Sequence, residues 1–485
     1  MSQHIDELPE DVGGPATEPD SDRPKGSESV FAGPYRALSL GVILSVGMVA
    51  FESLGVATVL PDIARDLDGL GAYGWGLSAL MLANIIGTVL AGKTADLRGP
   101  WAPAATGMAV FAAGCALAGA AGSWPLFLAG RFLQGLGVGA VMAMAYTVIG
   151  LAYPEHLRAR MFALLSSAWT IPSLIGPVLA GTLSDATSWR SVFLLMLPIV
   201  VLAALLTLPA LRNLERPQGE RTAAPAEPWW KGSLANAVLL TVGTGVLLQA
   251  LLLENLILLA VLAVAGAAVA VPALRRVTPE GTLTARAGLG AGVVIRGLLC
   301  GVYFGSEAYL PLGLQELRGQ SAWAAGLGLS AGAITWVFGS AWQAKRDATA
   351  GSRTTGVALG FAVLLVGVGL ITLTILTDAV PAWFAILGWA IGGVGMGVGF
   401  NASTTDTLEQ TPAERQGEMS GALQLAQTLA TGVIAGLGGA ALAICAHYDA
   451  GTRVALGSLF GFTGLLALVG VGLARRLRAP ATTTG

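Results

Sequence analysis

Charged residues are scarce in this sequence. Aspartate, glutamate, lysine and arginine make up 12% of its 485 residues, about half the share found in ordinary soluble domains. Apolar residues make up 54%, and the formal net charge is −2. This composition excludes an ordinary soluble domain. The small net charge and the scatter of basic residues among short loops argue against a nucleic-acid partner.

Cysteine and histidine are also rare, with three of each. Cys115, Cys300 and Cys445 lie in apolar runs without the spacing of a metal site, so we interpret them as packing residues. The histidines fall in the predicted tail or loops, which excludes a histidine proton relay inside a membrane. No GxxxxGK[ST] phosphate loop occurs, and no constellation suggests an enzyme or a bound cofactor. Energy for any transport would come from an ion gradient or from the substrate's own gradient.

The sequence has instead a succession of long apolar runs. Each contains about 18 residues or more, enough to cross about 30 Å of hydrocarbon at about 1.5 Å per residue. The sequence therefore predicts an all-α integral membrane protein. The fourteen predicted transmembrane spans are residues 38–60, 73–95, 102–122, 126–151, 161–183, 190–211, 234–253, 256–274, 289–311, 323–344, 355–377, 382–404, 418–446 and 455–474.

The polar segments predict the orientation in the membrane. Residues 1–37 are mostly polar, acidic and proline-rich, which is typical of a disordered tail. With that tail inside the cell, most basic loop residues also fall inside. The basic residues that fall outside are Arg65, Arg190, Arg318 and Arg453. This positive-inside bias predicts a multi-pass protein of the cell membrane with both termini in the cytoplasm.

A short repeat indicates how the spans are grouped. The segments ATVLPDIARDL (57–67) and EAYLPLGLQEL (307–317) both carry Leu-Pro, followed at the same distance by an acidic residue and leucine. We interpret them as equivalent ends of two parallel six-helix repeats. The predicted parts are a cytoplasmic tail 1–37, an N-terminal repeat 38–211, a cytoplasmic linker 212–233, an inserted transmembrane hairpin 234–274, a C-terminal repeat 289–474 and a cytoplasmic tail 475–485.

Five motifs along the chain suggest a family. They are FESLGVATVLPDIARDL (51–67), GKTADLRG (92–99), RFLQGLGVG (131–139), IPSLIGPVLAG (171–181) and SWRSVFLLMLPI (188–199). Together they resemble the major facilitator superfamily, specifically its fourteen-helix drug:proton antiporter branch. The resemblance covers residues 38 to 475 and implies the major facilitator fold.

GKTADLRG resembles the cytoplasmic gate motif that this family carries between its second and third helices. Gly92, Asp96 and Gly99 match the motif, while Pro100 stands where the family has a basic residue. The resemblance implies that Asp96 accepts hydrogen bonds from a neighbouring helix N-terminus, with Arg98 in part replacing the missing basic residues. The alternative is that these are solvated loop charges.

RFLQGLGVG resembles the fourth-helix motif whose arginine the family associates with proton coupling. Helical rise places Arg131 about 8 Å, and Glu52 about 13 Å, below the outer ends of their helices. A buried charge in a membrane needs a partner, and these two depths are similar, so we expect Glu52 and Arg131 to pair. The alternative is that Arg131 extends to the outer interface.

IPSLIGPVLAG resembles the antiporter signature of the fifth helix. Gly176, Pro177 and Gly181 match it, whereas Pro172 and Ala180 replace two glycines. Small residues permit close helix packing, and we expect the proline to kink the helix where it closes the outer end of a central cavity. The motif favours an exporter over an importer.

Glu307 is the second carboxylate inside an apolar run. It follows Arg296 by eleven residues, about 16 Å along a helix, so the two side chains are too far apart to pair. A carboxyl group in a low dielectric favours its neutral form, which is the property of a proton carrier. The alternative is that Glu307 lies close enough to the outer interface to be hydrated.

Several polar and aromatic residues are candidates for the lining of a substrate cavity. They are Gln134, Tyr146, Tyr303, Phe304, Asn401 and Gln424. Packing in the core or against lipid explains the aromatic residues equally well, and hydrogen bonds between helices explain the amides.

The resemblance implies a proton-coupled exporter of hydrophobic or amphipathic small molecules, with Glu52, Arg131 and Glu307 in proton coupling. Its partners would be the substrate, protons and the lipid bilayer. The alternative on the same fold is a lipid or glycolipid transporter, with a lipoprotein partner. A non-transporting receptor or scaffold is disfavoured by the two intramembrane acids.

Overall fold

The protein is described by a computed structural model that covers residues 29–33, 35–212, 232–253, 255–348, 352–412 and 415–478. The regular structure within these ranges is helical, and they contain no strand. Most of the predicted tails 1–37 and 475–485 and most of the predicted linker 212–233 lie outside the described residues.

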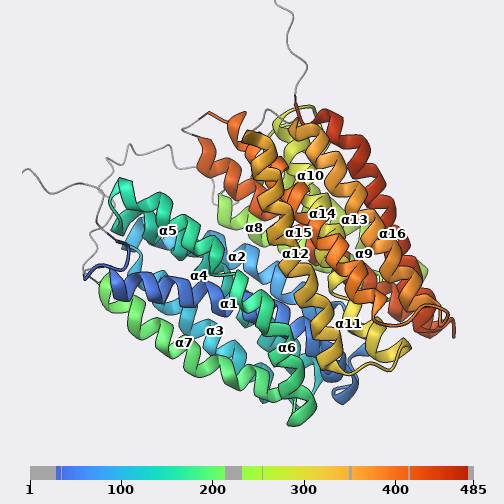
Figure 1. Ribbon diagram of the computed structural model, residues 1–485. Coiled ribbons are helices and arrows are strands. Elements are labelled where there is room, and N and C mark those ends of the chain that lie inside the picture. Colours follow the sequence, from blue (N-terminus) through green and yellow to red (C-terminus); the bar gives the residue numbers. More distant parts are fainter. Residues whose placement is uncertain are drawn as a thin grey trace, which may run out of the picture.

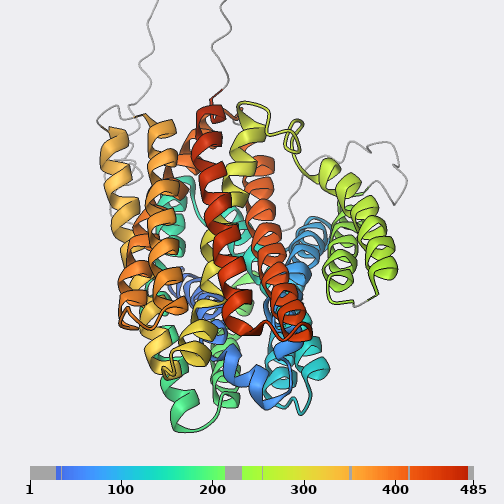
Figure 2. The same cartoon turned by 90° about the vertical axis from the view of Figure 1, so that its right-hand side faces the viewer.

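The helices form two bundles and a separate hairpin (Figures 1 and 2). The first bundle contains α1 (Arg36–Asp66), α2 (Trp75–Arg98), α3 (Trp101–Gly119), α4 (Trp124–Ala152), α5 (Glu155–Ser167), α6 (Thr170–Ala186) and α7 (Arg190–Leu211), with the short η1 (Leu70–Ala72) after α1. The hairpin contains α8 (Ser233–Ala250) and α9 (Leu256–Val277).

The second bundle contains α10 (Leu289–Glu307), α11 (Leu310–Leu312), the π-helical turn η3 (Gly313–Leu317), α12 (Ala322–Ala348), α13 (Arg353–Leu376), α14 (Phe384–Glu409), α15 (Gln416–His447), α16 (Gly451–Leu473) and η5 (Ala474–Arg476). The hairpin packs on the outside of the bundles, against α2 and α15 (Figure 2). Only 11% of the apolar window in α9 is buried, which fits a helix that faces lipid.

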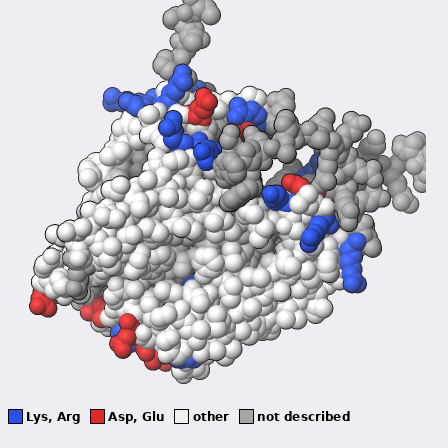
Figure 3. Space-filling model, turned by 180° about the vertical axis from the view of Figure 1, so that it is seen from behind, with Lys and Arg blue, Asp and Glu red and all other residues white. Residues whose placement is uncertain are grey.

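Thirteen helical segments in the described part of the chain are long and apolar enough to cross a membrane. The fifth predicted span, 161–183, is the one without such a helix, because it is divided between α5 and α6. The break at Ala168 and Trp169 lies four residues before Pro172, whose ring removes the hydrogen bond to the carbonyl of Ala168. The surface in Figure 3 agrees with membrane insertion, since a broad belt with almost no charged residues separates charges at the two ends.

The two Leu-Pro segments of the repeat adopt different structures. Helix α1 continues through Pro61 to Asp66. In the second segment α10 ends at Glu307, and the chain continues as α11 and the π-helical turn. Such π-helical turns often occur at functional positions.

The two bundles touch each other at the helix ends that carry these segments, which we call the contact end. Arg65 of α1 donates a hydrogen bond from Nη2 to Gln315 Oε1 at 2.7 Å and forms an ion pair from Nε to Glu316 Oε1 at 2.7 Å. At the same end the backbone N–H of Trp323 donates to Asp185 Oδ2 at 3.1 Å. The first turn of α12 is therefore held by a carboxylate of the opposite bundle.

Candidate functional site

A buried ion pair lies inside the first bundle. Glu52 on α1 and Arg131 on α4 are each 1% exposed, and Arg131 Nη1 donates to Glu52 Oε1. Arg131 also donates from Nη1 to Gln134 Oε1 and from Nε to the carbonyl of Gly76, both at 2.8 Å. The predicted pairing of Glu52 with Arg131 is confirmed, and an extended Arg131 at the interface is excluded. Three acceptors neutralise and orient this guanidinium, as a buried cation requires.

The second oxygen of Glu52 is different. Glu52 Oε2 is buried and has no hydrogen-bond partner among the described residues. A buried acceptor without a partner is costly. A role for this oxygen in proton coupling stays a prediction.

Glu307 occupies a buried site in the second bundle. It is 4% exposed, which argues against the hydrated alternative. Its Oε1 accepts a hydrogen bond from Trp389 Nε1 of α14 at 3.3 Å. The ring of Tyr303 stacks on Trp389 at a centroid distance of 4.6 Å, and the Tyr303 hydroxyl has no partner among the described residues. No feature of the sequence singled out Trp389, which lies in an apolar run like the other tryptophans of the helices.

The antiporter-type motif lies where the two bundles meet. A Cβ atom on Gly181 of α6 would come within 2.7 Å of the backbone of Ala322. A Cβ atom on Gly326 of α12 would come within 2.5 Å of the carbonyl oxygen of Pro177. Gly176 faces α1 instead, where a Cβ atom would lie 3.2 Å from the Phe51 ring. The motif therefore permits backbone contact between α6 and α12 at the contact end.

The predicted gate motif lies at the opposite end of α2 and is open in this structure. The side chains of Asp96 and Arg98 are exposed, and a Cβ atom on Gly92 would meet nothing within 4 Å. Gly99 ends α2 with φ 81°, a conformation that favours glycine. The role of this motif as a gate stays a prediction.

Comparisons with known proteins identify the family. The sequence model of the Major Facilitator Superfamily matches residues 40–435. The chain belongs to this superfamily. It is 30% identical over 436 residues to the probable actinorhodin transporter of Streptomyces coelicolor, covering 83% of this chain and 72% of that protein. It is 26% identical over 381 residues to the multidrug efflux pump SdrM of Staphylococcus aureus, covering 77% and 82% of the two chains.

Other relatives match over a shorter region. The multidrug transporter protein MdtP of Bacillus subtilis is 33% identical over 168 residues, and this alignment covers 35% of the chain but only 31% of MdtP. Among solved structures, the POT family transporter PepTSo superposes with a TM-score of 0.64 at 14% identity, over 90% of this chain and 97% of that one. That similarity supports the major facilitator fold alone. The protein is thus a multi-pass membrane protein of this superfamily.

The predicted cavity residues of this major facilitator protein fall into three groups by exposure. Gln134 is fully buried beside Arg131 and donates to Cys115 Sγ at 3.1 Å, and Tyr303 is 1% exposed, so neither lines an open surface. Tyr146 is 53% exposed, and Gln424 is exposed. The remaining two candidates are Phe304 and Asn401, which are partly buried.

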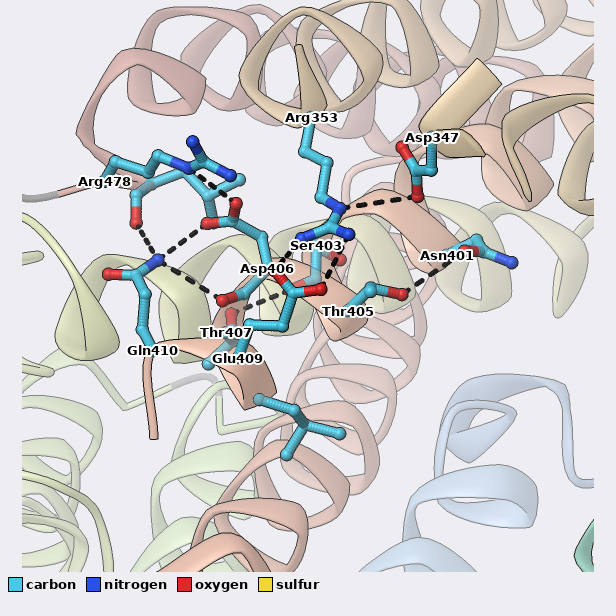
Figure 4. A network of polar contacts seen from close by, with 12 residues as sticks. Asp347, Arg353, Asn401, Ser403, Thr405, Asp406, Thr407, Glu409, Gln410 and Arg478 are labelled. Carbon is cyan, nitrogen blue, oxygen red and sulfur yellow. Dashed lines mark hydrogen bonds and ion pairs between the residues drawn. The ribbon is translucent and has the colours of Figure 1, made fainter. Parts of the chain in front are cut away.

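The second bundle carries a polar network around the last turns of α14 (Figure 4). Asp406 of α14 is 1% exposed and accepts from Arg478 Nε at 2.8 Å. Arg353 of α13 forms ion pairs with Glu409 and, at 3.4 Å, with Asp347. The last described residues of the chain are thereby tied to the end of α14.

Proposed function

We propose that the protein is a proton-coupled antiporter that exports hydrophobic or amphipathic small molecules across the cell membrane. The observation that carries this proposal is the buried ion pair of Glu52 and Arg131 with one carboxylate oxygen left without a partner. The names of two relatives, a multidrug efflux pump and a probable actinorhodin transporter, support small-molecule export.

The proposed cycle uses Glu52 as the proton carrier. A proton that arrives from outside binds Glu52 and removes its negative charge, which weakens the attraction to Arg131. In this cycle the weakened pairing favours outward release of substrate. Loss of the proton toward the inside restores the ion pair, and Glu307 in the second bundle provides a second carboxyl group of the same kind. Rocking of the two bundles supplies alternating access.

The orientation of the protein decides which state the structure represents. Lys and Arg residues gather at the end of the molecule nearest the chain termini, and acidic residues are prominent at the other end (Figure 3). By the positive-inside rule the termini lie in the cytoplasm and the contact end faces outward. The bundles are then closed toward the outside, which is the state expected to accept substrate from the cytoplasm.

The test is transport in inverted membrane vesicles, with a substrate found by a growth screen in a strain that lacks its own exporters. Glu52→Gln removes the titratable group while keeping the shape, so we expect proton-driven exchange to fall at least about tenfold, and Glu307→Gln to impair it as well. Substrate-for-substrate exchange without a proton gradient should persist.

Glu418→Gln is the matched control, because Glu418 is an exposed carboxylate at the start of α15. It should transport like the wild type. Unchanged proton-driven transport by Glu52→Gln would exclude the proposed coupling mechanism.

A further inference from the structure

Arg296 is a buried cation without a carboxylate partner. It lies on α10, is 7% exposed and donates from Nη1 to the Thr404 hydroxyl at 2.6 Å. Its Nε is buried and has no hydrogen-bond partner, and no acidic residue in the described part of the chain forms an ion pair with it. Arg131, the other fully membrane-embedded arginine discussed above, has a carboxylate and two further acceptors. A buried arginine with so few acceptors is costly, and such sites are commonly functional.

An aromatic surface adjoins this guanidinium. The Cζ atom of Arg296 lies 3.4 Å from the centroid of the Phe400 ring, which is a cation–π contact. The Phe400 ring lies 5.2 Å from Trp336, and Trp336 lies 5.8 Å from Phe304. The rings of Phe400, Trp336 and Phe304 thus form a chain of neighbouring aromatic groups that begins at the Arg296 guanidinium. All three residues are partly buried.

A residue of the first bundle interacts with this guanidinium. Tyr146 of α4 is close enough to Arg296 for an electrostatic interaction between them, although the two residues belong to different bundles. Tyr146 is 53% exposed and stacks with Phe162 of α5 at a ring-centroid distance of 6.2 Å. Arg296 therefore lies on the side of the second bundle that faces the first, and transporters of this fold hold their substrates between the two repeats.

We infer that Arg296 binds the carboxylate of an amphipathic organic anion whose apolar, preferably aromatic, body packs against Phe400 and Trp336. This inference rests on the proposed transport function, since it names the class of substrate that the protein would transport. A carboxylate accepts a charge-assisted hydrogen bond from the unpartnered Nε and neutralises the guanidinium. A cationic substrate would be repelled at this position, and a neutral one would leave the charge unpaired.

The test measures binding to purified protein in detergent without a proton gradient, by quenching of tryptophan fluorescence. The probes are 2-naphthoate and 2-naphthamide, which share a ring system and differ in the negative charge. We expect the wild type to bind 2-naphthoate at least about tenfold more tightly than 2-naphthamide. Arg296→Gln should abolish this difference, and Arg296→Lys should retain part of it. Phe400→Leu should weaken both probes.

Arg453→Gln is the control, because Arg453 is half-exposed and lies at the contact end beside Asp378; it should keep the wild-type preference. The inference is overturned if the wild type binds both probes equally, or if Arg296→Gln keeps the preference for 2-naphthoate. Should Arg296→Gln not fold, the wild-type ratio and Arg296→Lys decide.

Two further outcomes separate the alternatives. In nanodiscs, competition with 2-naphthoate by phosphatidylglycerol but not by phosphatidylcholine would assign the site to an anionic lipid headgroup and overturn the small-molecule occupant. Loss of proton coupling is measured separately in vesicles. An Arg296-dependent preference in a protein that shows no proton-driven transport would retain the anion site and remove the antiport mechanism.

Discussion

At the scale of single residues, the buried arginines of the two bundles have contrasting environments. Arg131 is matched by Glu52, Gln134 and a backbone carbonyl, whereas Arg296 has a hydroxyl group and an aromatic ring. A buried ion pair contributes little net stability, because desolvation offsets its attraction, but removal of one partner leaves an uncompensated charge. We therefore expect a single substitution in the Glu52–Arg131 pair to lower the free energy of unfolding more than substitution of both residues does.

The residue-scale prediction concerns stability. Glu52→Met should destabilise the protein by about 3–5 kcal/mol, because it leaves the Arg131 charge buried without a carboxylate. The double variant Glu52→Met, Arg131→Met should be less destabilised than Glu52→Met alone. Unfolding of the purified variants in detergent measures the difference. A double variant that is destabilised by the sum of the single effects would contradict the pairing.

At the scale of elements, the contact between α6 and α12 depends on glycine. Gly181 and Gly326 each leave room for a backbone atom of the other helix, within 2.7 Å and 2.5 Å of where a Cβ atom would be. Helices in membranes gain most of their association energy from such close packing. A side chain at either position would force the helices apart at the contact end.

The element-scale prediction is that Gly181→Val or Gly326→Val prevents closure of the contact end. Spin labels at Leu70 and Asp378, both exposed residues at that end of opposite bundles, should show a longer mean distance in these variants by double electron–electron resonance. Gly150→Val is the matched control, because a Cβ atom at Gly150 of α4 meets nothing within 4 Å. An unchanged distance distribution in Gly326→Val would show that this packing does not hold the end closed.

At the scale of the whole molecule, an ion pair between Arg65 and Glu316 also joins the two bundles, but it is partly exposed. The side chain of Arg65 is 46% exposed and that of Glu316 is 29% exposed. Exposed pairs of this kind contribute about 0.2–1 kcal/mol. We therefore expect helix packing to dominate closure and the ion pair to adjust it.

The molecule-scale prediction follows from that difference. Arg65→Ala should shift the balance between closed and open forms only about two- to fivefold, whereas the glycine variants should remove the closed form. Arg65→Glu should open the contact end further by repulsion from Glu316, and the added change Glu316→Arg should restore closure. The same pair of spin labels reports both effects. A loss of the closed form in Arg65→Ala as complete as in Gly326→Val would contradict this ranking.

The sequence by itself determined the membrane class, nearly all of the spans and the pairing of Glu52 with Arg131. Apolar length decides whether a helix crosses the bilayer, and helical rise places each residue at a depth. Opposite charges at similar depth in two membrane helices are expected to pair, because an unpaired charge in the membrane is costly. Pro172 also carries the information that the span 161–183 is broken, because it lacks the backbone N–H that a continuous helix would need.

Only the tertiary structure decided the neighbours that lie around each helix at a given depth. In the folded protein Gln134 accepts a hydrogen bond from Arg131 and does not face a cavity, and Trp389 donates to Glu307. Arg296 has no carboxylate partner among the described residues, and its Nε has no hydrogen-bond partner. The physical reason is that the rise of a helix determines depth, whereas rotation about its axis is set by packing against helices far away in the sequence. Closure at the contact end likewise depends on α6 and α12 from opposite bundles, which no local pattern brings together.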